Sequence, residues 1–363
     1  MGGPMRLCEL LGMELPILQA PMAGVQGSAL AVAVSEAGGL GALPCAMLDA
    51  ETRARELAAI RERTARPFNV NFFCHRPAPA DAAAQAAWRA ALAPWYRELE
   101  VDETAAASSG PPRLPFDAGA AALLEVFRPP VVSFHFGLPA PDLLDRVRRT
   151  GARVLASATT VEEARWLEAR GVDAIIAQGL EAGGHRGMFL AAALSTQVAT
   201  LALVPQVVDA VRVPVIAAGG IADARGVAAA LALGAAGVQV GTAYLLCPEA
   251  TTSPVHRAAL VGAGARHTVL TTLFSGRPAR GIVNRLIREL GPEHPAVPQF
   301  PGASDAIAPL RAAAEQRGSG DFSPLWAGQN VAGCRALPAG EITRALAAGV
   351  AAEGRGDRIG DGG

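Results

Sequence analysis

Short apolar runs alternate with longer amphipathic stretches along about the first 250 of the 363 residues. The short runs are continuous, as in strands buried on both faces, and predict strands at 17–20, 40–43, 68–73, 131–136, 153–156, 174–177, 215–218 and 238–240. The stretches between them have helical spacing, and several end at glycine; they predict helices at 28–37, 49–63, 142–149, 161–170, 197–211 and 224–233. Eight such units predict an α/β fold, the (β/α)8 TIM barrel.

A doubly wound open sheet is the alternative arrangement of alternating strands and helices. That fold would place a glycine fingerprint directly after the first strand. Here Pro21-Met22-Ala23-Gly24 stands in that position. The barrel is therefore the preferred interpretation.

Two regions depart from the repeat. Residues 80–127 are long for one connection and combine a helical Ala/Trp-rich stretch with a loop, so we predict an insertion in a barrel formed by residues 1–250. Residues 251–352 are mainly helical, with one strand expected at 269–273, and are predicted to form a C-terminal subdomain over the barrel mouth. Residues 353–363 are rich in Gly, Asp and Arg and are predicted to be disordered.

The chain contains no lysine, since all 32 Lys+Arg residues are arginine. This excludes Schiff-base chemistry, a pyridoxal phosphate anchor and a Walker A lysine. An anion must instead be bound by arginine, by a helix N-terminus or by backbone N–H groups in glycine loops.

Charge and cysteine usage indicate which partners and which compartment to expect. The formal net charge of -1 argues against a nucleic-acid partner, and charges at Arg212, Asp223 and Arg225 interrupt the most apolar stretch before it could span a membrane. The five cysteines are odd in number and widely spaced, and the N-terminus lacks a signal-peptide pattern. We therefore expect a cytoplasmic monomer or homodimer.

Glycines and polar residues follow several of the predicted strands. In a barrel these positions meet at one face, where active sites lie. Gly219-Gly220 follows the seventh strand, and Gln239-Val240-Gly241-Thr242 covers the eighth. One such loop alone would indicate only a tight turn, but two adjacent loops predict a phosphate site.

His185 lies in the glycine-rich segment Gly183-Gly184-His185-Arg186-Gly187 after the sixth strand. A histidine in this place can transfer a proton; the alternative is an incidental surface histidine in a flexible loop. His135 is expected either at the same mouth or hydrogen-bonded in the core, whereas His256, His267 and His294 are expected at the surface. Since no cluster has metal-ligand spacing, we expect no catalytic metal.

Two amides and a methionine suit a flat heteroaromatic ligand. Asn71 and Gln178 offer a donor and an acceptor each, as an isoalloxazine edge requires, and Met22 could pack against the ring. The alternatives are amides paired to the backbone and an ordinary core methionine.

Seven motifs in order resemble the nitronate monooxygenase family. They run from Leu15–Gly24, through Asn69–Phe73, Glu181–Gly187, Ala218–Ala222 and Gln239–Thr242, to Phe274–Gly281 and Ala327–Gly333. The resemblance implies FMN as a non-covalent cofactor, and oxidation of alkyl nitronates by O2 to a carbonyl compound and nitrite.

The resemblance also implies roles for individual residues. His185 would lie near the flavin N5, act as base on a neutral nitroalkane and, when protonated, pair with an anionic nitronate; Arg186 is a second candidate cation. The implied cofactor residues are Ala20, Pro21, Met22, Asn71, Gln178, Gly183, Gly184, Gly219, Gly220, Gln239, Val240, Gly241 and Thr242.

The substrate pocket departs from the family pattern. Family members often carry several tyrosines and a lysine there, whereas this chain has only Tyr96 and Tyr244 and no lysine. His135, Arg186 and Trp326 are the candidates to line the pocket instead. Two alternative functions remain, an FMN-dependent enoyl-ACP reductase that uses NAD(P)H and a flavin-binding module without catalytic activity.

Overall fold

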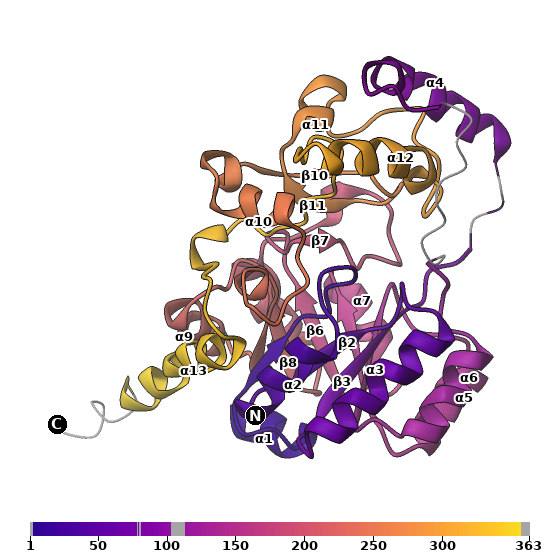
Figure 1. The fold of residues 1–363 in the computed structure, drawn as a ribbon. Coiled ribbons are helices and arrows are strands. Elements are labelled where there is room, and N and C mark those ends of the chain that lie inside the picture. The colour runs from indigo at the N-terminus through magenta and orange to yellow at the C-terminus, as the bar shows by residue number, and fades with distance from the viewer. Residues whose placement is uncertain (1–2, 78, 80, 103–112, 357–363) are drawn as a thin grey trace.

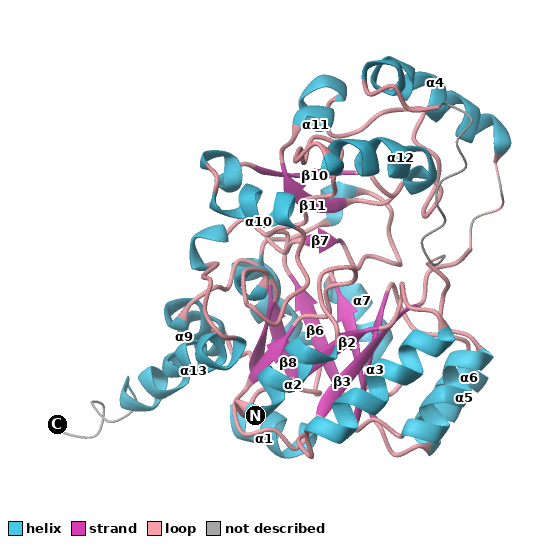
Figure 2. Cartoon of the chain, in the orientation of Figure 1, coloured by secondary structure: helices cyan, strands magenta, loops and turns pink. Residues whose placement is uncertain are grey.

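The computed structural model describes residues 3–77, 79, 81–102 and 113–356. Eight parallel strands form its central sheet, in the order β1-β9-β8-β6-β5-β4-β3-β2. A parallel bridge between Leu18 and Leu40 joins the two outermost strands, so the sheet closes into a barrel (Figures 1 and 2). The strands are β1 (Ile17–Gln19), β2 (Gly41–Pro44), β3 (Phe68–Phe73), β4 (Val131–His135), β5 (Arg153–Ala158), β6 (Ala174–Gln178), β8 (Val215–Ala218) and β9 (Gly237–Val240). The predicted TIM barrel is confirmed.

The helices of the barrel surround these strands. They are α2 (Ser28–Glu36), α3 (Ala50–Arg63), α5 (Ala118–Phe127), α6 (Pro141–Arg149), α7 (Val161–Glu168), α8 (Thr200–Ala210) and α9 (Ala224–Ala232). Several N-caps are the residue types that satisfy free helical N–H groups: Asp49, Asp117, Thr160 and Asp223 each accept from a backbone N–H of the first turn. The bounds of each predicted barrel helix lie within a few residues of those expected from the sequence.

Apolar side chains fill both the barrel interior and the space under the helices. Leu18, Leu40, Leu155 and Ile216 belong to the interior cluster, and each is at most 1% exposed. Helix α1 (Pro4–Leu11) packs into the same cluster through its buried leucines. This core leaves only the carboxyl ends of the strands for a ligand.

A cap covers the carboxyl ends of the strands. It contains α10 (Pro254–Val261), α11 (Arg285–Leu290), α12 (Ala303–Gln316) and a small antiparallel sheet in the order β10-β11-β7. Strand β10 (Thr268–Thr271) was predicted close to this position. Strands β7 (Gly184–His185) and β11 (Ala279–Ile282) were not predicted.

Helix α4 (Ala82–Glu98) lies in the predicted insertion yet packs into the cap (Figure 1). Trp88 and Tyr96 are buried among cap side chains, and they donate to the carbonyls of Ala303 and Ala306. Helix α5, at the end of the same segment, packs beside α6 in the barrel ring. The cap is thus built from two segments far apart in the sequence.

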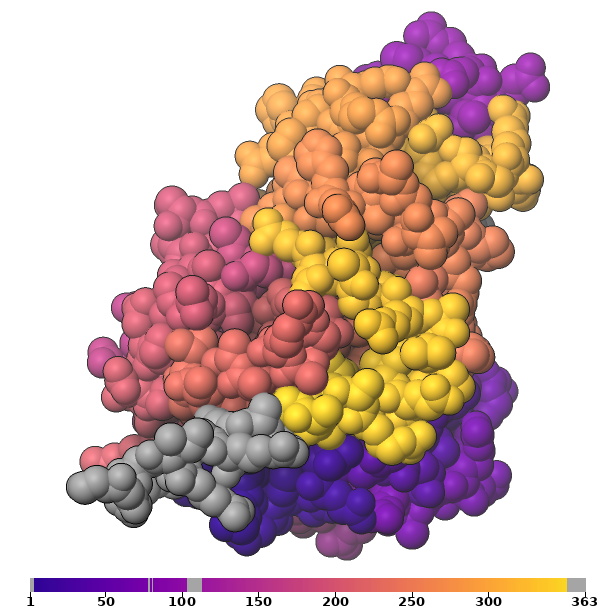
Figure 3. Space-filling model, turned by 90° about the vertical axis from the view of Figure 1, so that its left-hand side faces the viewer, coloured from indigo at the N-terminus to yellow at the C-terminus, as the bar shows by residue number. Residues whose placement is uncertain are grey.

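Helix α13 (Ala339–Gly356) returns from the cap to the barrel. It packs against α9 and α2, in the place of an eighth barrel helix. Figure 3 shows this C-terminal segment, in yellow, crossing from the cap to the N-terminal part of the chain. The helix extends into the segment 353–363, and residues 357–363 lie outside the described residues.

Across the described ranges, no helix combines the length and apolar character that crossing a bilayer requires.

Candidate active site

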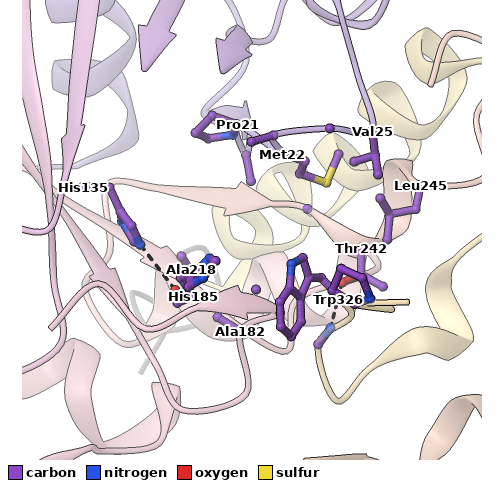
Figure 4. Close-up of a pocket in the computed structure, with 18 of the residues that line it drawn as sticks. Pro21, Met22, Val25, His135, Ala182, His185, Ala218, Thr242, Leu245 and Trp326 are labelled. Carbon is purple, nitrogen blue, oxygen red and sulfur yellow. Dashed lines mark hydrogen bonds between the residues drawn. The ribbon is translucent and has the colours of Figure 1, made fainter. Parts of the chain in front are cut away.

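A large cavity opens where the barrel strands end beneath the cap (Figure 4). Its wall takes residues from around the barrel, and Trp326 from the cap adds to it. Figure 4 shows Pro21, Met22 and Val25 on one side, with Ala182 and His185 across from them. The barrel contributes Ala20 after β1, Asn71, His135, Ser157, Gln178, Ala218 and Gln239.

The predicted cofactor residues line this cavity, with the exception of Val240. Val240 is 1% exposed, and its side chain belongs to the apolar core under the helices. Its carbonyl accepts from the Ala20 N–H at 2.8 Å. Val240 therefore supports the wall from behind and does not face a ligand.

The loops after β8 and β9 have the properties of an anion site. Gly219 and Gly220 adopt φ angles of 121° and 73°, a region that L side chains rarely adopt. They precede helix α9, whose N-terminus carries a partial positive charge. The cap ties both loops, since the Gly328 N–H donates to Thr242 Oγ1 and Asn330 Nδ2 donates to the Gly220 carbonyl.

One buried polar atom in the wall lacks a partner. Gln239 Oε1 is buried and accepts no hydrogen bond within the described residues, although buried polar groups are nearly always paired. A flat heteroaromatic ligand with an N–H at its edge would satisfy this acceptor. The site therefore fits a phosphate-bearing heteroaromatic cofactor at both ends.

His185 is held by the small sheet of the cap. Its backbone pairs with Ala279 of β11, and its Nε2 lies 2.9 Å from Ser275 Oγ. The Ser275 hydroxyl donates to the Arg277 carbonyl, so its oxygen accepts from His185 Nε2–H. This network leaves Nδ1 as the basic nitrogen of His185.

The surroundings of His185 keep its imidazole neutral. Burial, then the charges of Arg113, His135, Arg277 and His75, lower its pKa well below the ordinary value of 6.5. These surroundings disfavour the imidazolium in the ligand-free site, and the pairing of protonated His185 with a bound anion stays a prediction. His185 is suited to accept a proton.

Two neighbouring side chains fix the backbone of the loop that carries His185. Gln178 Nε2 and His135 Nε2 both donate to the His185 carbonyl, at 3.0 and 3.3 Å. Gln178 Oε1 accepts from the Gly187 N–H. His135 lines the cavity as predicted, and burial, more than neighbouring charges, lowers its pKa to about 3. Gln178 corresponds to the alternative interpretation of an amide paired to the backbone.

Arg186 does not line the cavity. Its side chain is fully buried, and its guanidinium donates to the carbonyls of Gln178 and Gly179 and to Gln197 Oε1. The prediction that Arg186 lies in the substrate pocket is therefore wrong. Trp326 lines the cavity as predicted, with its ring 5.6 Å from that of His185.

Several residues of the wall and of the shell around His185 were not predicted. His256, expected at the surface, is buried against the cavity, where its Nε2 donates to the Trp326 carbonyl. Arg113 comes from the loop before α5, and Phe300 lies 5.5 Å from the His185 ring. Ser275 belongs to the motif Phe274–Gly281, but its contact with His185 forms only when the cap folds over the barrel. No pattern in the sequence near Ser275 indicates this contact.

The TIM barrel and its cavity, lined by His185 and the glycine loops at the carboxyl ends of the strands, define a barrel enzyme, and the family match makes it an oxidoreductase. Within that class the chain belongs to the nitronate monooxygenase family, whose sequence model matches residues 5–349. The nitronate monooxygenase of Pseudomonas aeruginosa is 45% identical over 349 residues, covering 94% of this chain and 97% of its own. That of Paraburkholderia phytofirmans is 44% identical, covering 95% and 94%. The protein is therefore an enzyme, an oxidoreductase.

Solved structures agree with this assignment. A nitroalkane oxidase from Streptomyces ansochromogenes superposes with a TM-score of 0.87 at 40% identity, covering 96% of this chain and 99% of its own. FabK from Thermotoga maritima is more distant, with a TM-score of 0.70 at 27% identity and coverage of 98% of both chains.

Proposed function

We propose that this enzyme oxidises alkyl nitronates, and neutral nitroalkanes after proton abstraction, with O2 and FMN, yielding a carbonyl compound and nitrite. Family membership and the names of the relatives support the reaction class. The observation that carries the proposal is the half-buried His185, which lines the cavity together with the glycine loops after β8 and β9.

Family members are flavoproteins, which supports a flavin cofactor, and we propose that this flavin is FMN. Backbone N–H groups around Gly219–Gly220 and Gly241–Thr242 would hold its phosphate, and Gln239 Oε1 would accept from an N–H of its ring. Met22 and Gly184 would flank the ring. When bound, FMN supplies the two-electron redox chemistry that the side chains cannot.

The residues around His185 support its action as a base. Its Nδ1 would take the α-proton of a neutral nitroalkane, and the Nε2–H donated to Ser275 would hold the ring during that transfer. Burial keeps the imidazole unprotonated at neutral pH, so the base is ready before the substrate binds. A nitronate has already lost this proton and needs no base.

Phe73, Phe136, Phe300 and Trp326 surround His185, with ring centroids 5.5–6.4 Å from its own. Such walls exclude water and strengthen electrostatic interactions in the cavity. They suit the short alkyl chain of a nitronate.

Cofactor release tests the flavin assignment. Heat-denatured protein is expected to release FMN, identified by chromatography, and the apoprotein is expected to rebind FMN. An apoprotein that takes up no flavin would defeat the proposal.

Anaerobic NADH addition tests the reductase alternative. The nitronate-oxidising enzyme should keep its flavin oxidised with NADH, whereas rapid reduction by NADH would support an enoyl reductase.

A further inference from the structure

The cavity offers few positive charges to an anionic substrate. Burial lowers the pKa of His135 to about 3 and that of His256 to about 4, and it lowers the pKa of His185 as well, so these histidines are neutral at pH 7. Arg186 lies outside the cavity. Among the described wall residues, Arg113, Arg311 and Glu315 carry charge.

Arg311 is already neutralised. Its Nε lies 2.7 Å from Glu315 Oε1, one helical turn further along α12. The same carboxylate oxygen accepts from Ser323 Oγ. This pair therefore brings no net charge to the cavity.

Arg113 has no such acidic partner. Its Nη1 donates to Ser304 Oγ at 2.9 Å, a neutral hydroxyl, and no carboxylate of a described residue lies within ion-pair distance. Asp305 is the acidic group whose charge it senses. Burial and the charge of Arg311 lower its pKa, yet a guanidinium starts so far above neutrality that Arg113 remains a cation.

We propose that Arg113 is the anion-binding residue of this cavity and pairs with the charged nitro group of a bound nitronate. The proposal rests on the function proposed above and divides two tasks between two side chains. Arg113 supplies the positive charge, and His185 stays neutral as the base. A planar guanidinium suits this task because it donates two parallel N–H bonds to the two oxygens of a planar anion.

The same cation acts on His185. Arg113 is foremost among the charged groups that lower the pKa of His185; the others are His135 from β4, Arg277 from the turn before β11, and His75 after β3. Removing Arg113 stabilises the imidazolium, so the pKa of His185 rises. Looser packing that admitted water would raise this pKa as well, so the ligand affinities, and not the pKa alone, separate the charge of Arg113 from its packing.

Three small ligands of nearly equal shape test the proposal. Ethyl nitronate is the anionic substrate, propionate is a stable anion with the same number of non-hydrogen atoms, and nitroethane is the neutral counterpart. Arg113→Gln is expected to raise the KM for ethyl nitronate and the Kd for propionate, measured by calorimetry, about tenfold to a hundredfold. The KM for nitroethane should change little, and Arg113→Lys should retain part of the affinity for both anions.

Arg153→Gln is the matched control, since it removes one positive charge from the amino end of β5, opposite the cavity. It should leave the KM or Kd of all three ligands unchanged.

Arg113→Gln should also move the acid limb of kcat/KM for nitroethane to higher pH, because the base must lose a proton that it now holds more tightly.

Unchanged binding of both anions by Arg113→Gln would overturn the proposal. So would an equal loss for anions and nitroethane, which would indicate that Arg113 only maintains the wall. Calorimetry with propionate needs no turnover. A wild-type protein that binds propionate through Arg113 but does not oxidise ethyl nitronate would therefore refute the proposed function while supporting the anion site.

Discussion

His185 is half-buried beside the glycine loops of the cavity, and its Nε2–H is held by Ser275; this combination predicts how its replacement will behave. His185→Asn removes the base but keeps a polar side chain of similar reach. We expect kcat/KM for nitroethane to fall about 100-fold to 10,000-fold, the usual contribution of a general base. Turnover of ethyl nitronate should fall far less, because that substrate needs no proton abstraction.

Oxygen consumption with the two substrates, at equal flavin content, measures this split. Equal losses for both substrates would mean that His185 does not act as a base. Unchanged turnover of nitroethane would show that His185 takes no part in the reaction.

The pH dependence follows from the same residue. A base works only when deprotonated, and the pKa of His185 lies well below 6.5. As the pH falls, kcat/KM for nitroethane should therefore hold through pH 6.5 and decline only below it. A decline centred above pH 6.5 in the wild-type enzyme would contradict the described surroundings of His185.

The sequence predicts the position of His185 at the cavity but not the burial of its neighbour Arg186. His185 and Arg186 share a glycine-rich segment that suggests an exposed loop, yet β7 ends at His185 and successive side chains of an extended chain point to opposite faces. His185 thus faces the cavity, whereas Arg186 is fully buried and bound to carbonyls. The small strand that creates this alternation leaves no local signal, since β7 pairs with residues of β11 far along the chain.

The loop after β8 has no room for an added methyl group at Gly219. Gly219 has a φ of 121°, and a Cβ there would lie 2.8 Å from Thr200 Oγ1 and 3.1 Å from the Ala182 N–H. Gly219→Ala must therefore displace the loop proposed to hold phosphate. We expect the Kd for FMN to rise about tenfold or more, measured by fluorescence titration of the apoprotein.

Gly151→Ala is the control. Gly151 also has a positive φ, 87°, but its Cβ would meet nothing within 4 Å, and it lies before β5, away from the cavity. Both variants pay a left-handed backbone cost of roughly 1–2 kcal/mol. If both weakened FMN binding equally, or neither did, the loop after β8 would not be the phosphate site.

The barrel strands could be predicted because most are continuous apolar runs, and β3 alternates apolar residues with Asn69 and Asn71. Phe68–Phe73 and Val215–Ala218 have the predicted bounds. The positions of the proposed cofactor residues follow from these strands, since the carboxyl end of each strand fixes where the next residues lie. Burial set by the cap could not be predicted: His75 lies in a loop and His256 in helix α10, and neither local pattern indicates that the folded cap buries the side chain.

At the scale of the molecule, the barrel and cap are interlocked. Helix α4 leaves the barrel to build the cap core, and α13 leaves the cap to complete the barrel ring. An amphipathic pattern shows that a helix has an apolar face, but it does not show which surface that face will cover. Barrel and cap therefore do not divide at one point such as the predicted boundary at residue 250. Helix α4 precedes this boundary and belongs to the cap, whereas α13 follows it and completes the barrel ring.

The cap completes the chemistry of the barrel. Ser275 orients His185, Trp326 adds to the wall, and the Gly328 N–H binds Thr242 in the loop after β9. The barrel alone supplies glycine loops and a basic residue, and the cap supplies the apolar enclosure. Electron transfer from a nitronate should therefore need the whole chain.

Anaerobic mixing of the flavin-loaded enzyme with ethyl nitronate is the decisive test of nitronate oxidation. We expect the visible absorbance of oxidised flavin to disappear without NADH, and admission of O2 to restore it with release of nitrite. An absorbance that ethyl nitronate leaves unchanged, while NADH abolishes it, would refute nitronate oxidation by this enzyme.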